Sequence, residues 1–233
     1  MVFTGTFFST INKKIITQGQ AFYPDTLNPI IKINFDDTET LPSGESLGGT
    51  AVSTLQSTGQ VKRGTYSGDF TSTRNLTISN TTGWFTNPMT ISFWHYSDPN
   101  STADVYEILV GSSTYATNFR FYKYVRGSGK YSFYVWDDGS YVTDYNVDGG
   151  TTMDNTWTHI VLRVSTNTVN VVVNGNTASP RINGTLTGVQ GGGTMQLCGT
   201  GVSQYETDRY LDEFYVYDRL LTDTEVQNIY NAY

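Results

Sequence analysis

The last twenty-four residues of the chain place an alternating strand directly before a short capped helix, and this pairing narrows the possible folds. The segment LDEFYVY alternates with the period of two of a β-strand, which predicts that Asp212 shares a face with Phe214 and Val216. Thr222 and Glu225 have the spacing of a capping box, in which each side chain satisfies an orphan backbone donor at a helix start. The segment therefore predicts a closing strand and a helix, with one carboxylate on the apolar side of the strand.

A carboxylate on the apolar side of a strand needs an explanation, because burying an unpaired charge is costly. Hydrogen bonds, a cation or protonation can relieve that cost. Two explanations are open for Asp212. It binds a metal ion, or it accepts hydrogen bonds from neighbouring backbone amides or from Arg209 without a metal.

The composition is that of one all-β domain with many turns. Aromatic residues make up 14% of the 233 residues, charged residues only 15%, and 23 glycines stand among abundant Thr, Ser and Asn. The formal net charge of −7 opposes binding to nucleic acid and to anionic membranes. No apolar run is long enough to insert into a membrane, and no signal peptide is recognisable at the N-terminus.

The chain divides into an N-terminal arm, residues 1–29, and one domain, residues 30–233. The arm has mixed composition; it folds back, docks onto a neighbouring chain, or forms a partly ordered tail. Alternating apolar runs then recur between turn signals, and Asp138-Gly139 and Asn174-Gly175 are hairpin signals because both turn residues must reach positive φ. The clearest predicted strands are 75–78, 89–96, 106–110, 118–125, 130–136, 157–164, 168–173, 195–198 and 211–217.

Many short strands joined by tight turns favour a sandwich or a jelly roll. Cys198 is the single cysteine, so an internal disulfide and a multi-cysteine metal site are excluded, and a small buried residue is expected.

Several segments, taken in order, resemble laminin G-like jelly rolls of the concanavalin A-like lectin and glucanase superfamily, over about residues 31–233. They are INFDD, VKRGTYSGDF, NLTISN, MTISFWHY, NTWTHIVLRVS, NTVNVVVNGN, MQLCGTG and YLDEFYVYDRLLTDTEVQNIY. The resemblance implies an all-β fold, a two-sheet antiparallel jelly-roll sandwich with a short C-terminal helix. The departures are Cys198 where an Ile is common, His95 on the central strand, and the arm.

The resemblance also implies a structural calcium ion where the closing strand meets the start of the domain. Asp212 looks equivalent to the closing-strand aspartate, with Asp36 or a backbone carbonyl near Gly68 beside it. Carboxylate and carbonyl oxygens are the ligands that Ca²⁺ takes in proteins. Asp36, Asp212 and Gly68 are therefore the predicted metal site.

Catalysis is not expected. The glucanases of this superfamily place two glutamates on one strand face as Glu-x-Asp-x-Glu, or with one further residue, and none of the six glutamates here stands in that pattern. Trp157 and His159 share a strand face, which suits a catalytic imidazole beside an aromatic platform, but the resemblance implies core packing. Neither His159 nor His95 has an obvious nucleophile and acid partner within its motif. We therefore predict no enzyme activity.

Two neighbouring strands carry aromatic side chains that share a face with polar groups. Arg120 lies with two tyrosines on one strand, and Ser132 lies with a tyrosine and a tryptophan on the next. Rings beside hydrogen-bonding groups suit a sugar, and the alternative is packing under a loop or against the second sheet. The predicted ligand-binding residues are Tyr122, Tyr124, Tyr134, Trp136 and Asp138, and Tyr141 and Tyr145 could extend the patch.

The sequence leaves three functions open. The first is a non-catalytic structural or interaction protein, a surface or assembly component of a virus particle or another extracellular structure, whose arm contacts other structural proteins. The second is a carbohydrate-binding module or adhesin that recognises glycans through the Tyr/Trp face. The third is a divergent polysaccharide-cleaving enzyme. A surface-type composition, the arm and the missing catalytic set favour the first.

Overall fold

A computed structural model gives the structure of the protein. It describes residues 23–36, 39–70, 74–79, 88–97, 105–112, 119–126, 130–137, 140–143, 155–165, 167–186, 194–198 and 209–233. None of the helices within these ranges has the length and apolar character needed to cross a membrane.

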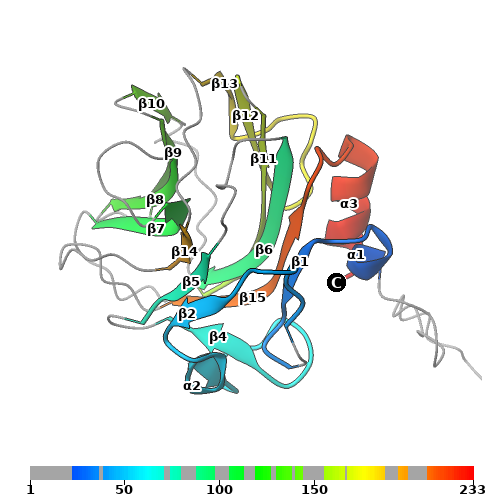
Figure 1. The fold of residues 1–233 in the computed structure, drawn as a ribbon. Coiled ribbons are helices and arrows are strands. Elements are labelled where there is room, and N and C mark those ends of the chain that lie inside the picture. Colours follow the sequence, from blue (N-terminus) through cyan, green and yellow to red (C-terminus); the bar gives the residue numbers. More distant parts are fainter. Residues whose placement is uncertain are drawn as a thin grey trace, which may run out of the picture.

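Two antiparallel sheets face each other in the molecule (Figure 1). Sheet A has the order β13 (Ile182–Thr185), β12 (Thr168–Val173), β11 (Trp157–Val164), β6 (Met89–Ser97), β15 (Arg209–Tyr217), β4 (Ser67–Asp69) and β3 (Gln56–Ser57), with β1 (Ile31–Ile33) also paired to β15. Sheet B has the order β10 (Ser140–Thr143), β9 (Lys130–Asp137), β8 (Arg120–Arg126), β7 (Val105–Ser112), β14 (Thr194–Leu197), β5 (Leu76–Ser79) and β2 (Leu47–Gly49). The predicted all-β sandwich is confirmed.

Every strand that the alternation predicts is present, with bounds that agree to within two residues. The predicted strands 157–164 and 168–173 coincide with β11 and β12. Asn174 and Gly175 both have positive φ, 49° and 68°, and the Asn176 amide closes the turn onto the Val173 carbonyl, as the hairpin signal predicts. Strand β10 pairs Ser140 with Asp137, which leaves only residues 138 and 139 between β9 and β10.

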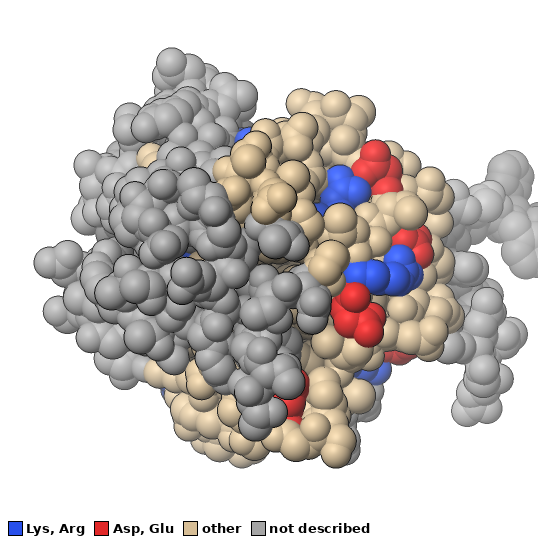
Figure 2. Space-filling model, turned by 45° about the horizontal axis from the view of Figure 1, so that its top comes forward, with Lys and Arg blue, Asp and Glu red and all other residues tan. Residues whose placement is uncertain are grey.

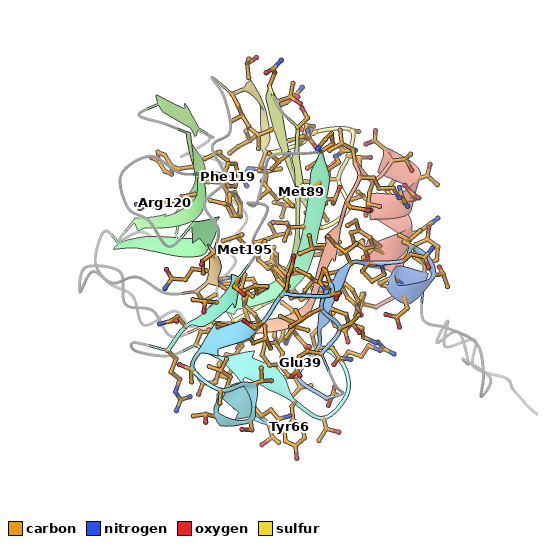
Figure 3. The ribbon with its side chains drawn as sticks, viewed as in Figure 1. Glu39, Tyr66, Met89, Phe119, Arg120 and Met195 are labelled. Carbon is orange, nitrogen blue, oxygen red and sulfur yellow. The ribbon has the colours of Figure 1, made fainter. Side chains whose placement is uncertain are left out.

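The main core fills the space between the sheets. Sheet A contributes Phe93 and Phe214, whose ring centroids are 6.1 Å apart, and sheet B contributes the stacked pair Phe121 and Phe133 at 5.4 Å. Phe119 and Met195 lie on the side of sheet B that faces sheet A (Figure 3). Cys198 is fully buried in this core, as predicted.

A second apolar cluster lies on the outer face of sheet A, where helix α3 (Asp223–Asn231) packs (Figure 1). Val226 and Ile229 of the helix pack in one cluster with Tyr215 and Tyr217 of β15. The predicted capping box is present: the Glu225 amide donates to Thr222 Oγ1 at 3.2 Å, and the Thr222 amide donates to Glu225 Oε2 at 2.8 Å.

The predicted alternation of the closing strand is wrong in its middle. The register of β15 against β6 shifts between Asp212 and Tyr215, and Glu213 has a φ of 52°. This β-bulge inserts one extra residue, so the side chains after it change face. Phe214 and Val216 join Leu211 in the main core, whereas Asp212 lies opposite Trp94 on the outer face.

The end of the expected arm packs against the domain. Residues 23–26 form the short helix α1 (Tyr23–Thr26), which lies beside α3 (Figure 1). The Tyr217 hydroxyl donates to the Pro24 carbonyl, and the Asn228 side chain donates to the Tyr23 hydroxyl. Residues 1–22 of the arm lie outside the described residues. A second short helix, α2 (Val52–Leu55), precedes β3.

Candidate functional site

The predicted ligand face lies on β8 and β9 of sheet B. The strands pair so that residue 122 stands directly opposite Tyr134 and residue 136 directly opposite Arg120. Phe121, Phe133 and Val135 occupy the alternate positions and are fully buried in the core. Positions 122, 124, 134 and 136 therefore belong to the outer face of sheet B, away from the core.

Two side chains of this face are described. Tyr134 is half-buried, and Arg120 is only 4% exposed. Arg120 extends to the side of β8 opposite to Phe119 (Figure 3). The side chains of Tyr122, Tyr124 and Trp136 and the whole of Asp138 lie outside the described residues, as does Tyr145. In the neighbouring strand β10, position 141 stands opposite position 136, and the side chain of Tyr141 also lies outside the described ones.

Asp212 is fully buried and accepts hydrogen bonds from three backbone amides. Its Oδ2 accepts from the amides of Lys62 and Arg63, both at 3.0 Å, and its Oδ1 accepts from the Glu213 amide at 2.8 Å. Burial raises the pKa of Asp212 to about 8, although the backbone donors act in the opposite direction. Asp212 thus fixes the loop that precedes β4 onto the outer face of sheet A.

Asp36, which precedes this loop in the chain, also accepts hydrogen bonds from it. Its Oδ1 accepts from the amides of Thr65 and Tyr66 at 2.7 and 2.9 Å. The loop approaches this carboxylate so closely that a Cβ added to Gly64, whose φ is 76°, would lie 1.7 Å from Asp36 Oδ2. Asp36 and Asp212, which the sequence interpretation groups as metal ligands, thus both accept hydrogen bonds from backbone amides of residues 62–66.

The predicted calcium ligands do not fit a cation in this arrangement. Both oxygens of Asp212 and one oxygen of Asp36 already accept amide hydrogens, and an ion there would face those hydrogens. Gly68 is paired with Leu211 and packs under the Phe35 ring, where an added Cβ would lie 2.3 Å from Cζ. Among the described residues, no three His, Cys, Asp or Glu side chains form a group able to hold a metal ion. Hydrogen bonding from neighbouring backbone amides, the alternative kept open for Asp212, is the arrangement observed.

Glu213 forms a second buried acidic centre that the sequence interpretation missed. It is 1% exposed and accepts hydrogen bonds from the hydroxyls of Tyr215 and Tyr233, the latter at 2.8 Å. Arg63 Nη1 lies 3.3 Å from Oε1 and forms an ion pair with it. Burial, together with the Glu213 charge, raises the pKa of both tyrosines, which stay protonated as donors. Glu213 stands at the β-bulge with a φ of 52°, and strand alternation in the sequence carries no signal for a bulge.

His159 has the packing role that the resemblance implies. It is fully buried, its Nε2 lies 2.9 Å from Ser92 Oγ, and its ring centroid lies 5.0 Å from that of Trp94. Tyr230 of α3 stacks on it at 6.0 Å. Burial lowers the pKa of His159 to about 3, so the imidazole is neutral near pH 7. Trp157 differs from this expectation, because it is half-buried on the outer face.

The comparisons with known proteins define the family. The Laminin_G_3 family model, described as the concanavalin A-like lectin/glucanases superfamily, matches residues 70–227, which is more than half of the chain. The chain therefore belongs to the concanavalin A-like lectin/glucanase superfamily. No curated protein matches the sequence.

Solved structures share the fold at low sequence identity. The receptor-binding domain of botulinum neurotoxin D has a TM-score of 0.65 at 11% identity, over 90% of this chain and 53% of that one. The botulinum neurotoxin serotype D ligand-binding domain in complex with N-acetylneuraminic acid has a TM-score of 0.65 at 11% identity, over 90% of this chain and 52% of that one. The binding domain of Paraclostridial Mosquitocidal Protein 1 has a TM-score of 0.65 at 17% identity, over 90% of this chain and 53% of that one. This chain thus spans about half the length of these solved chains, and such identities show the fold alone.

Proposed function

We propose that the domain is a non-catalytic, lectin-like module that binds glycans on the outer face of sheet B. The register of β8 and β9 carries this proposal, because it aligns the four aromatic positions 122, 124, 134 and 136 on one face. Aromatic rings stack on the apolar faces of sugars, and neighbouring polar groups bind the hydroxyls. Tyr134, which is half-buried, is the aromatic residue of this face whose side chain is described.

The charge distribution supports a neutral or weakly charged ligand. Acidic and basic side chains lie side by side on the described surface (Figure 2). The described ion pairs include Arg163 with Asp223 at 2.6 Å and Arg219 with Glu225 at 2.7 Å. With a net charge of −7, such a surface disfavours polyanions and suits sugar hydroxyls. The N-acetylneuraminic acid complex of the serotype D ligand-binding domain is a precedent for a sugar ligand in a chain that contains this fold.

The absence of turnover is part of the proposal. The superfamily name includes glucanases, so cleavage is the competing function. Glu213 has both carboxylate oxygens engaged by Arg63 and two tyrosine hydroxyls, which does not suit an acid or a nucleophile. We place the module outside the cell. Assembly into a virus particle through residues 1–29 stays a prediction, to be tested by whether deleting residues 1–22 prevents incorporation into a larger particle.

A glycan array tests the proposal. The wild-type chain is compared with Trp136→Ala and Tyr134→Ala, and with Tyr66→Ala as a control, because Tyr66 is a 36% exposed aromatic residue outside β8 and β9. We expect one glycan class to bind the wild type and the control, and each test variant to weaken binding by roughly tenfold. A silent array overturns glycan binding. Release of reducing ends from any polysaccharide overturns the non-catalytic assignment.

A further inference from the structure

The apolar cluster beneath helix α3 is separate from the main core. Val226 and Ile229 are the buried side chains of the helix, and they pack on the outer face of sheet A instead of between the sheets (Figure 1). The core between the sheets shares no residue with this cluster. Moving α3 away would therefore uncover the outer face of sheet A and leave the packing between the two sheets intact.

Helix α3 depends on that packing for its own shape. It has nine residues, and isolated helices shorter than about 12–15 residues are marginal in water. Within the described residues, α3 contributes no strand pairing to either sheet, and side chains join it to the sandwich. The helix and its contacts are therefore formed or lost together, which defines a small cooperative unit.

The polar contacts near the start of the helix are exposed to solvent. Arg163 of β11 forms an ion pair with Asp223, whose side chain is 60% exposed, and Gln227 donates to Thr177 in an exposed hydrogen bond. An exposed ion pair contributes little to stability, because solvent screens it and ordering two side chains costs entropy. These contacts therefore do little to hold the helix in place.

A buried polar contact lies just beyond the end of the helix. The Tyr233 hydroxyl donates to Glu213 Oε2 at 2.8 Å, and the Tyr233 ring centroid lies 5.2 Å from that of Trp94. Glu213 is 1% exposed, and a hydrogen bond to a carboxylate is stronger than one between neutral groups. Tyr233 therefore attaches the C-terminal end of this unit to the bulge of β15.

The docked helix covers polar atoms that it does not satisfy. Trp94 is 3% exposed, and the rings of Tyr230 and Tyr233 lie against it. Among the described residues, Trp94 Nε1 has no hydrogen-bond partner, and neither has Nδ1 of the fully buried His159. A buried polar atom without a partner opposes docking, because it has given up its hydrogen bonds to water. The docked and undocked positions of α3 are therefore closer in free energy than the apolar contacts alone would make them.

The chain before the helix places the hinge. The Leu221 amide donates to Thr90 Oγ1 at 2.9 Å, and the Leu221 carbonyl accepts from Arg163 Nη1 at 3.2 Å. Both backbone groups of Leu221 are thus held on sheet A. Thr222 follows at an exposed position, with an extended backbone of φ −70° and ψ 162°. The hinge therefore lies at Thr222, between the fixed Leu221 and the helix.

We propose that α3 and Tyr233 form a lid that opens about Thr222 as one unit while both sheets stay folded, and that the hydrogen bond from Tyr233 to Glu213 is its lock. The open lid uncovers Trp94 and Lys62, whose ammonium lies 3.7 Å from the Trp94 ring centroid, on the outer face of sheet A. The lid thus controls access to this face. It belongs to the sheet opposite to the proposed glycan face, and it does not depend on glycan binding.

Native-state hydrogen exchange, followed by NMR over a series of low urea concentrations, tests the lid. The probes are the backbone amides of residues 226–231 in α3, those of residues 89–97 in β6, and the indole N–H of Trp94. We expect the α3 amides to exchange at least roughly tenfold faster than the β6 amides, and the Trp94 indole to follow the α3 amides. Exchange in α3 should also depend less on urea, because opening the lid exposes less surface than unfolding the sandwich.

Two variants separate the lid from the sandwich. Tyr233→Phe removes the lock and keeps the ring, and the lost contact is absent from the open lid and from the unfolded chain alike. The α3, indole and β6 hydrogens should therefore all exchange roughly tenfold faster. Ile78→Val makes a small cavity in the main core, on the sheet B side, which the open lid leaves packed. It should speed the β6 amides by roughly fivefold and leave the α3 amides unchanged.

Tyr66→Phe, at an exposed tyrosine, is the control and should change none of these rates. Equal exchange rates and equal urea dependence for α3 and β6 would mean that the helix leaves only when the whole domain unfolds, and this overturns the lid. The lid is also overturned if Ile78→Val speeds α3 as much as β6, or if the Trp94 indole does not follow the α3 amides. An α3 exchange rate that Tyr233→Phe leaves unchanged overturns the lock.

Discussion

The Lys62 ammonium lies 3.7 Å from the centroid of the Trp94 ring, while the Lys62 backbone amide donates to Asp212, the residue paired with Trp94 across the sheet. One residue therefore ties its loop to the outer face of sheet A twice, by a cation–π contact and by a hydrogen bond. Tyr233, just beyond the end of α3, lies on the same place, with its ring centroid 5.9 Å from the ammonium. Loop, sheet and C-terminal segment meet around this lysine.

Replacing Lys62 with Met keeps an unbranched apolar stem and removes the charge. Because burial also lowers the pKa of Lys62, part of the cation–π gain is offset by desolvation. We expect Lys62→Met to lower the free energy of unfolding by about 1 kcal/mol, measured by urea denaturation. Lys32→Met is the control. Lys32 forms an ion pair with Asp25, whereas the ring contacts of Lys62 are with Trp94 and Tyr233. An unchanged midpoint for Lys62→Met would mean that the ring contact contributes nothing.

Asp212 makes stability depend on pH. Burial raises the pKa of Asp212 from an ordinary 3.8 to about 8, so the folded protein binds this proton more tightly than the unfolded chain. Its contribution is full below pH 3.8 and is lost as the pH rises through about 8, and the free energy of unfolding should fall across that interval. Urea unfolding at a series of pH values measures this slope.

Asp212→Asn is expected to flatten the slope, because the amide cannot ionise. Asp212→Asn should also lower the free energy of unfolding by about 1–3 kcal/mol. The NH₂ group of Asn would face one of the backbone amides that donate to Asp212 in the wild type. Asp218→Asn at an exposed position is the matched control. A wild-type stability that instead rises across this interval would show that the three amide donors, and not burial, determine the protonation of Asp212.

Gly68 is required by the close approach of Phe35. A Cβ at position 68 would lie 2.3 Å from Phe35 Cζ and 2.7 Å from Phe70 Cε2, both in the main core. Gly68→Ala should therefore lower the free energy of unfolding by about 1–3 kcal/mol through overpacking. Gly59→Ala, where a Cβ would meet nothing closer than 3.3 Å, should change it much less. Equal melting temperatures for the two variants would contradict this account.

The capping box of α3 gives a smaller effect. Thr222→Ala removes the acceptor of the Glu225 amide and should cost about 1 kcal/mol in thermal or urea unfolding. Thr224→Ala, at an exposed position inside the helix, serves as the control. Hydrogen bonds from Arg219 lower the pKa of Glu225 to about 2, so its contribution is present above pH 4.5 and is lost as the pH falls towards 2. A cap variant as stable as the control would rule out a role for the box.

Calcium remains a prediction of the family resemblance that melting experiments can decide. Because the Asp212 and Asp36 carboxylates accept amide hydrogens, we expect the same melting temperature in excess calcium and in chelator. A bound ion would raise the melting temperature with calcium concentration by mass action. A calcium-dependent rise that Asp212→Asn abolishes would restore the metal site and refute the amide-capping account.

The local sequence pattern predicts the strands of this protein, but it does not predict the surroundings of Asp212 and Glu213. Alternation gives β11 and β12 their bounds because half-buried strands in an antiparallel sandwich repeat with period two. It fails at Glu213, because a bulge depends on how β15 pairs with β6. Asp212 is a buried acid, as the pattern predicts, but it lies on the outer face of sheet A and not on the face of Phe214 and Val216.

The sequence by itself determined the two-sheet class, the capped helix and the buried cysteine. Each of these depends on local spacing or on a recognisable order of segments. The tertiary structure decided which residues from distant strands stand side by side, as Trp157, Tyr96 and Tyr210 do. It also decided that backbone amides reach Asp212, because the loop that supplies two of them lies about 150 residues away in the chain.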